Sequence, residues 1–254
     1  MDIFNPLPDE KKVILELLDQ DEHYYGDFGK QFLSNSDIKA LREDPKRFKA
    51  PVEPNIHLLM GGAFHTMVLE PHKFEGNYPV IDASSRQTTK YKKEAGDDMV
   101  LLTSDMELLI SMKNRIEKNE QIQSIIQGDN VEYEVPAFGE ICGEMWKGKA
   151  DVVNHDDKLV IDVKTTSDLN KFHLSAKRYN YDSQAFIYKE FFGYDFVFVV
   201  IDKKTLNMGF YDCSSNFYKT GREKVIDAVH AYRMYWKDQQ DFDWDNYLLK
   251  TETL

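Results

Sequence analysis

Asp162 and Lys164 stand two positions apart in an otherwise apolar segment that also holds Val160, Ile161 and Val163. In a β-strand, alternate residues point to the same face, so the carboxylate and the ammonium would be neighbours. A carboxylate in such a place can bind a divalent cation, and an ammonium can orient a water molecule or contact a phosphate beside it. The segment therefore predicts a metal-assisted site on a buried strand.

An ordinary ion pair on an exposed strand is the alternative, because the acid–x–lysine spacing recurs in the chain, as at Asp9 and Lys11. Two features favour a site. A carboxylate and an ammonium that are buried together need compensating interactions. In addition, Asp151 ends the preceding predicted strand, and hairpin pairing would bring its carboxylate towards the same metal. We therefore expect Asp151, Asp162 and Lys164 to share one site.

Five further residues could serve such a site, although each also has a purely structural interpretation. Glu132 and Glu134 lie on one face of the first predicted strand. Gln184 and Tyr188 are four residues apart on a predicted helix and share a face, as polar and aromatic residues of an amphipathic helix often do. His65 lies on an otherwise apolar helix, where a histidine is more often a core residue than a metal ligand or a phosphate contact.

The chain is acidic, with 32 basic and 44 acidic side chains and a net charge of -12. Nucleic-acid binding relies on lysine and arginine contacts with phosphates, so positive charge must gather locally if DNA is the ligand. The polar stretch 86–93 holds Arg86 and three lysines, Lys90 among them, and no acidic residue. It predicts a flexible basic loop that contacts the DNA backbone beside the site; a solvated surface loop is the alternative.

Apolar periodicity and capping residues predict the elements that must position these side chains. Helices are expected over residues 8–20, 38–42, 57–70, 104–127, 182–192 and from 215 onward. Strands are expected over residues 131–138, 145–153, 159–164, 196–201 and 208–211, and residues 82–99 are expected to be irregular. We expect a single domain over 1–254, with a mainly helical part (1–127) followed by an α/β catalytic core (128–254).

Composition excludes several classes of protein. Two cysteines, Cys142 and Cys213, rule out a disulfide-rich scaffold and a four-cysteine zinc or iron–sulfur site within one chain. The longest apolar runs are too short to span a bilayer, so no membrane association is expected. Residues 1–6 lack the basic and apolar regions of a secretory signal, which favours a reducing cytoplasm.

Several stretches occur in the order found in the PD-(D/E)XK nuclease superfamily. They are Leu33–Phe48, Gly61–Pro71, Arg86–Lys90, Gly148–Asp151, Asp162–Thr166 and Gln184–Tyr188. More narrowly, the chain resembles phage-type RecE-like exonucleases (exodeoxyribonuclease VIII), which are related to lambda exonuclease and to RecB nuclease domains. The resemblance implies a restriction-endonuclease-like α/β fold, in which helices flank a mixed central sheet and a helical N-terminal part forms one wall of the site.

The resemblance also implies a role for each candidate residue. Asp151 and Asp162 would bind Mg²⁺ or Mn²⁺, with the Val163 carbonyl as a further ligand and His65 as the extra ligand of the RecB-like branch. Lys164 would position the attacking water and stabilise charge on the phosphate.

Supporting roles follow from the same resemblance. Glu132 or Glu134 would be the acidic residue of the first core strand, and the spacing to Asp151 favours Glu132. Gln184 and Tyr188 would support the site or contact a DNA phosphate. The remaining DNA-contacting or supporting candidates are Thr165, Arg86 and Lys90.

The implied activity is that of a metal-dependent deoxyribonuclease, and most narrowly of a 5′-to-3′ exonuclease that acts on double-stranded DNA ends and leaves 3′ overhangs for recombination. The alternatives are another task on the same site (endonuclease, flap or single-strand cleavage), a non-catalytic DNA-binding module and a protein-binding scaffold. The resemblance further implies a homo-oligomer, a single-strand annealing recombinase as partner, and a phage or prophage origin in a bacterial cytoplasm. The cysteines of the iron–sulfur branch are missing, so no iron–sulfur cluster is expected.

Overall fold

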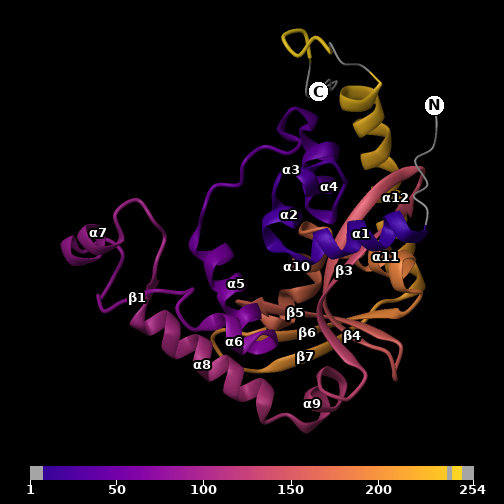
Figure 1. Cartoon of the computed structure of the whole chain (residues 1–254). Coiled ribbons are helices and arrows are strands. Elements are labelled where there is room, and N and C mark those ends of the chain that lie inside the picture. Colours follow the sequence, from indigo (N-terminus) through magenta and orange to yellow (C-terminus); the bar gives the residue numbers. More distant parts are fainter. Residues whose placement is uncertain (1–7, 239–241, 248–254) are drawn as a thin grey trace.

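The central sheet of the computed structural model has five strands, whose spatial order β3-β4-β5-β6-β7 is also their order in the chain (Figure 1). The strands are β3 (Val131–Ile141), β4 (Glu144–Asn154), β5 (Leu159–Thr166), β6 (Asp195–Asp202) and β7 (Met208–Asp212). β5 and β6 are parallel, and each other neighbouring pair is antiparallel. The structure describes residues 8–238 and 242–247, so the expectation about a secretory signal at residues 1–6 lies outside the described residues.

The parallel pairing of β5 and β6 requires a crossover connection, because parallel neighbours cannot be joined by a tight turn. Two helices form this connection, α10 (Phe172–Arg178) and α11 (Tyr181–Phe192). The register runs to Thr166 opposite Asp202, so both strands end at the same edge of the sheet. Side chains that follow β5 and β6 therefore meet at that edge.

Helices cover both faces of the sheet. One face carries α4 (Asn35–Glu43), α11 and α12 (Ser215–Tyr232); the other carries α5 (Ile56–Leu69), α8 (Thr103–Glu117) and α9 (Glu120–Ile126). Alternation along β6 feeds the two cores: Phe196, Phe198 and Val200 pack on the first side, and Val197, Val199 and Ile201 on the second. Helices that precede residue 127 thus supply much of one layer against the sheet.

Shorter elements complete the chain. α1 (Pro8–Asp19) packs beside β3 through Leu18 and Phe138. The others are α2 (Asp21–Tyr25), α3 (Asp27–Lys30), η1 (Pro45–Arg47), α6 (Pro71–Phe74), β1 (Val80–Ile81), α7 (Thr89–Ala95), β2 (Leu101–Leu102), η2 (Leu169–Lys171) and η3 (Arg233–Lys237). Each helix of the described residues is too short or too polar to cross a bilayer.

The expected mixed sheet between helices is confirmed, but two local expectations are wrong. The helix expected over 104–127 is broken into α8 and α9, because the Asn119 side chain accepts a hydrogen bond from the Ile122 amide (2.9 Å) and begins a new helix. Residues 82–99 are not irregular: the Thr88 hydroxyl caps α7, and the Tyr91 hydroxyl bonds both to the carbonyl and to the amide of Val100 (2.8 Å each).

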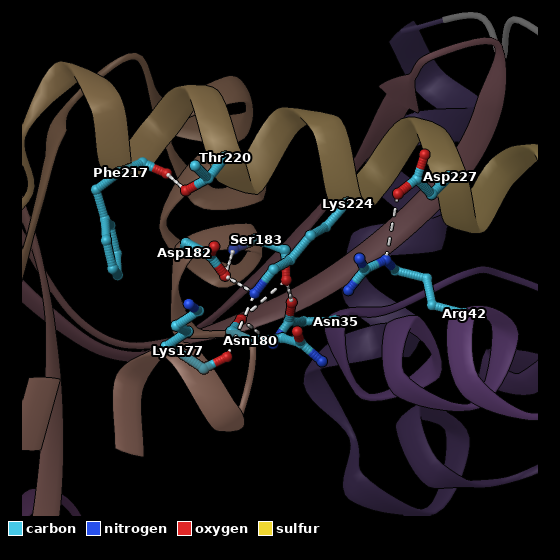
Figure 2. A network of polar contacts seen from close by, with 10 residues as sticks. All are labelled: Asn35, Arg42, Lys177, Asn180, Asp182, Ser183, Phe217, Thr220, Lys224 and Asp227. Carbon is cyan, nitrogen blue, oxygen red and sulfur yellow. Dashed lines mark hydrogen bonds and ion pairs between the residues drawn. The ribbon is translucent and has the colours of Figure 1, made fainter. Parts of the chain in front are cut away.

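A polar network joins α4, α11 and α12 on the first face of the sheet (Figure 2). Asp182 is buried and accepts a hydrogen bond from the Lys224 ammonium (2.7 Å), and the Ser183 hydroxyl donates to the Asn35 side chain (2.6 Å). At Gly221 the helices touch, since a Cβ there would lie 2.0 Å from the carbonyl oxygen of Asp182. The network fixes α11, the helix that carries Gln184.

Candidate active site

Acidic residues of β3, an edge strand of the sheet, and of its neighbour β4 face each other. The register pairs Tyr133 with Val152 and Val135 with Ala150, so Glu134 stands opposite Asp151. Glu134 has a φ of 50°, a left-handed conformation that is rare for a residue with a Cβ. Side chains directly opposite each other in an antiparallel pair share a face, so this register gathers the two carboxylates.

His65 joins them from α5. Ala63, Phe64 and Met67 bury this helix against the sheet, which places His65 over β4. The His65 Nδ1 lies 3.3 Å from Asp151 Oδ2. One ligand atom each from His65, Glu134 and Asp151 lie within 4.8 Å of one another, a group that could hold a metal ion.

The strand β5 brings Asp162 and Lys164 to the same site. Asp162 is 2% exposed, and its Oδ1 accepts hydrogen bonds from Lys164 Nζ (2.8 Å) and Gln184 Nε2 (2.7 Å). The amide of Val163 donates to Asp151 Oδ2 (2.8 Å), which ties β5 to β4 at this point. The predicted neighbourhood of Asp151, Asp162 and Lys164 is therefore what the structure shows.

The charges of the site favour an ion pair between His65 and Asp151. Although burial lowers it, the charge and hydrogen bond of Asp151 raise the pKa of His65 from 6.5 to about 9. Burial opposes ionisation of Asp151 as well, but His65 holds the pKa of that carboxyl below its usual range. Both groups are therefore charged at neutral pH.

Glu134 and Lys164 respond to the same environment. Burial, with repulsion from Asp151, raises the pKa of Glu134 from 4.5 to about 7. Although burial lowers it, the charges of Asp162 and Asp151 hold the pKa of Lys164 above its usual value. Lys164 thus stays protonated, and it serves as a hydrogen-bond donor and a positive charge rather than as a proton acceptor.

A divalent cation fits the residues present. His65, Glu134 and Asp151 form the donor set, because one ligand atom from each lies within 4.8 Å of the others. Carboxylate oxygens with one imidazole nitrogen suit Mn²⁺ and related divalent ions. Asp162 is buried beside this group; its Oδ2 lies 2.8 Å from the Lys164 ammonium and accepts no hydrogen bond within the part of the chain that the structure describes.

This group lies in a cleft of ≈ 1120 Å³. One wall comes from α2 and α5, and the other from the ends of β5 and β6 together with α10. Thr165, a candidate residue from the sequence, lines the cleft beside Lys164. Tyr25 and Lys149 also line the cleft, and they were not among the residues predicted from the sequence.

The structure contradicts the preference for Glu132 over Glu134 as the acidic residue of the first core strand, because Glu134 is the one that lies with Asp151. The Glu132 carboxylate is mostly exposed and bonds to His155 Nε2 (3.1 Å), outside the group around Asp151. The expectation used regular alternation, which puts both glutamates on one face; the left-handed conformation of Glu134 breaks that regularity.

Tyr188 supports the sheet instead of facing DNA. Its buried hydroxyl donates to the Lys149 carbonyl (2.8 Å) and accepts from the Lys149 amide (3.0 Å). The supporting role predicted for Tyr188 fits these contacts, and the predicted phosphate contact does not. Gln184, by contrast, holds Asp162 directly.

Arg86 and Lys90 lie outside the residues that line the cleft. The Arg86 guanidinium pairs with Asp105, which also accepts a hydrogen bond from the Leu102 amide (2.7 Å). Lys90 Nζ donates to the Asp82 carbonyl (2.5 Å) at the start of α7. Arg86 and Lys90 therefore belong to a small folded excursion rather than to a flexible loop that lines the cleft, and their contact with DNA stays a prediction.

Two further residues that line the cleft were not predicted from the sequence. The ring of Tyr181 lies 5.3 Å from Lys164 Nζ, and Lys203 follows β6 into the cleft. The sequence carries only weak signals for them. Tyr181 opens the helix that holds Gln184, and Lys203 comes directly after a strongly apolar strand.

A mixed sheet with carboxylates on two adjacent strands, and a lysine two residues beyond the second, defines the restriction-endonuclease-like class of nuclease folds. The expected fold class is thereby confirmed. The chain belongs to the family described as PDDEXK-like domain of unknown function (DUF3799), whose model matches residues 29–243.

One of two similar solved structures, with a TM-score of 0.65, agrees with this assignment at the level of fold. A crystal structure named "Putative exonuclease" from Eubacterium rectale is 17% identical with a TM-score of 0.65, and the match covers 92% of this chain and 96% of that chain. A phage related exonuclease from Haemophilus somnus 129PT is 14% identical with a TM-score of 0.33, covering 61% of this chain and 89% of that one. A comparison with curated proteins found no significant match.

Proposed function

We propose that the protein is a Mg²⁺- or Mn²⁺-dependent deoxyribonuclease that degrades double-stranded DNA from its ends, 5′ to 3′, and leaves 3′ single-stranded overhangs. The observation that carries the proposal is the group of His65, Glu134 and Asp151, which could hold a metal ion, with the buried ion pair of Asp162 and Lys164 on the neighbouring strand. Membership of a PDDEXK-like family supports a nuclease. The end specificity and the polarity rest on the resemblance to RecE-like exonucleases.

The side chains divide the work. A bound cation would supply activation of water and neutralisation of charge on the scissile phosphate. Lys164, which stays protonated, donates to the substrate phosphate or to the attacking water. Gln184 restrains the rotation of the Asp162 carboxylate through a hydrogen bond to Oδ1, and Oδ2 lies against the Lys164 ammonium. Tyr181 stabilises the Lys164 ammonium through its ring face.

The proposal extends to the assembly and its setting. A closed homo-oligomer around duplex DNA would keep the enzyme on its substrate between cuts. The 3′ overhang is the substrate of a single-strand annealing recombinase, which is the partner we propose. The setting is a bacterial cytoplasm, with a phage or prophage origin.

Linear duplex DNA, labelled at one 5′ end or at one 3′ end, tests the activity and its direction. With Mg²⁺ or Mn²⁺, the 5′ label should be released early as a mononucleotide and the 3′ label last; with EDTA, neither should be released. Asp162→Asn should lower the rate at least about 100-fold while the circular-dichroism spectrum stays unchanged.

Covalently closed circular duplex serves as the control substrate. If it is cut as fast as linear DNA, the protein is an endonuclease. Wild-type protein that binds DNA but cuts none of these substrates would be a binding module. Early release of the 3′ label would reverse the proposed polarity.

A further inference from the structure

The acidic side chains that line the cleft all lie in one half of it, where Lys149 pairs with Asp21 and His65 with Asp151. The acidic residues that line it, Asp21, Glu70, Glu134 and Asp151, all come from α2, α5 with its C-terminal cap, β3 and β4. The other half, from the ends of β5 and β6 and from α10, contributes Lys164, Lys203 and hydroxyl groups. A metal ion suits the first half, and an anion suits the second.

Lys203 lies at the far end of the second half. Its amide donates to the Thr166 carbonyl (2.9 Å), which places it where the parallel strands β5 and β6 end together. The neighbouring Asp202 does not neutralise it, because the Asp202 carboxylate is buried and accepts the amides of Lys204 (2.8 Å) and Leu169 (2.9 Å). Within residues 8–238 and 242–247, no carboxylate forms an ion pair with Lys203.

Three hydroxyl groups in the same half are also uncommitted. Among the described residues, the side chains of Thr165, Ser167 and Ser175 make no hydrogen bond, although they line the cleft between Lys164 and α10. Lysine ammonium and serine or threonine hydroxyl groups are common ligands of nucleic-acid phosphates. Thr166 lies two residue steps beyond Lys164 on β5, about 7 Å along the strand. Because the Lys203 amide bonds to the Thr166 carbonyl, the Lys203 backbone lies further along the sheet than Lys164, where its side chain is placed to contact a different phosphate.

We propose that Lys203, with Thr165, Ser167 and Ser175, forms a second phosphate subsite, which binds the phosphate next to the scissile one on the same strand. This inference rests on the proposed function, since it takes Lys164 to mark the scissile phosphate. The bound group is either the terminal 5′-phosphate or the neighbouring internal phosphodiester. Lys203 acts here as a positioning residue, and it touches no reacting atom.

The test compares Lys203→Ala with Lys204→Ala, a matched control one residue further on and outside the cleft lining. Binding to short duplexes is followed by fluorescence anisotropy in EDTA over a series of salt concentrations. Lys203→Ala should weaken binding several-fold and reduce the salt slope by about one unit. Lys204→Ala should keep the wild-type slope, and Lys203→Arg should restore it.

Duplexes with a 5′-phosphate or a 5′-hydroxyl distinguish the two sources of the phosphate. If Lys203→Ala weakens only the phosphorylated end, the subsite holds the terminal phosphate; if both ends weaken equally, it holds an internal one. Equal salt slopes for Lys203→Ala and wild type would overturn this subsite and leave the proposed function intact. Wild-type protein that binds no DNA would overturn both.

Discussion

Glu134 stands opposite Asp151 in the strand register and has a left-handed backbone conformation. A left-handed φ at a residue with a Cβ costs about 1–3 kcal/mol, and the Glu134 carboxylate lies in the group with His65 and Asp151. Glu132, two residues earlier, keeps to the strand pattern and faces His155. The two glutamates therefore give a matched pair of positions, one inside the donor set and one outside it.

We expect Glu134→Gln to weaken Mn²⁺ binding at least about tenfold, because a charged ligand is replaced by a neutral one. Glu132→Gln should leave the affinity within a factor of two of wild type, roughly the limit of such a titration. Isothermal titration calorimetry at pH 7.5 measures both. If the two variants bind Mn²⁺ equally well, Glu134 does not belong to the donor set.

The pH dependence of stability in EDTA should report His65 and Glu134. His65 has a pKa of about 9 in the fold against 6.5, so its contribution is complete below pH 6.5 and is lost as the pH rises through about 9. Glu134, at about 7 against 4.5, acts with the same sign over a lower range. The melting temperature should therefore fall from pH 6 to pH 9.

His65→Gln provides the comparison for this pH series. It removes the group that titrates near pH 9, so its melting temperature should change less than that of wild type between pH 7 and pH 9. A wild-type melting temperature that rises over this interval would contradict the assigned ion pair between His65 and Asp151.

At the scale of elements, the close contact of α11 and α12 requires a glycine at position 221. We expect Gly221→Ala to lower the free energy of unfolding by about 1–3 kcal/mol, because the new methyl group would overlap the Asp182 carbonyl and push the helices apart. Gly61→Ala is the control: nothing lies within 4 Å of its Cβ, and alanine favours a helix by about 1 kcal/mol. Urea unfolding should thus move the two variants in opposite directions.

Most long elements follow from apolar periodicity in the sequence, and capping side chains also mark the start of α5 (Asn55) and α12 (Ser214). The strand β5 and the spacing of Asp162 and Lys164 were predictable for this reason. Glu134 was not, since its position depends on one backbone angle that no pattern records. The role of Arg86 was not predictable either. Its positive charge suggested a DNA contact, but in the fold it pairs with Asp105. Lys203 becomes visible only through the parallel pairing of β5 and β6.

At the scale of the whole molecule, the net charge of -12 means that DNA binding depends on where the positive side chains gather. The excursion around α7 has its own small core and pairs Arg86 with Asp105. We expect Arg86→Ala to lower the free energy of unfolding by about 2 kcal/mol and to leave the salt slope of DNA binding unchanged. Urea unfolding and anisotropy check the two effects. A flattened salt slope with normal stability would return Arg86 to the DNA interface.

The site draws His65, Glu134, Asp151, Asp162 and Gln184 from α5, β3, β4, β5 and α11. A ribosome adds residues from the N-terminus, so a nascent chain that ends at Asp151 holds three of the donors but lacks Lys164 and the helix that orients Asp162. β5 also needs its parallel neighbour β6, which is made after α11. Contacts so distant along the chain form late. We therefore expect a growing polypeptide to complete the site only after the strand that ends at Asp202 has emerged, so the proposed nuclease activity would be withheld during synthesis.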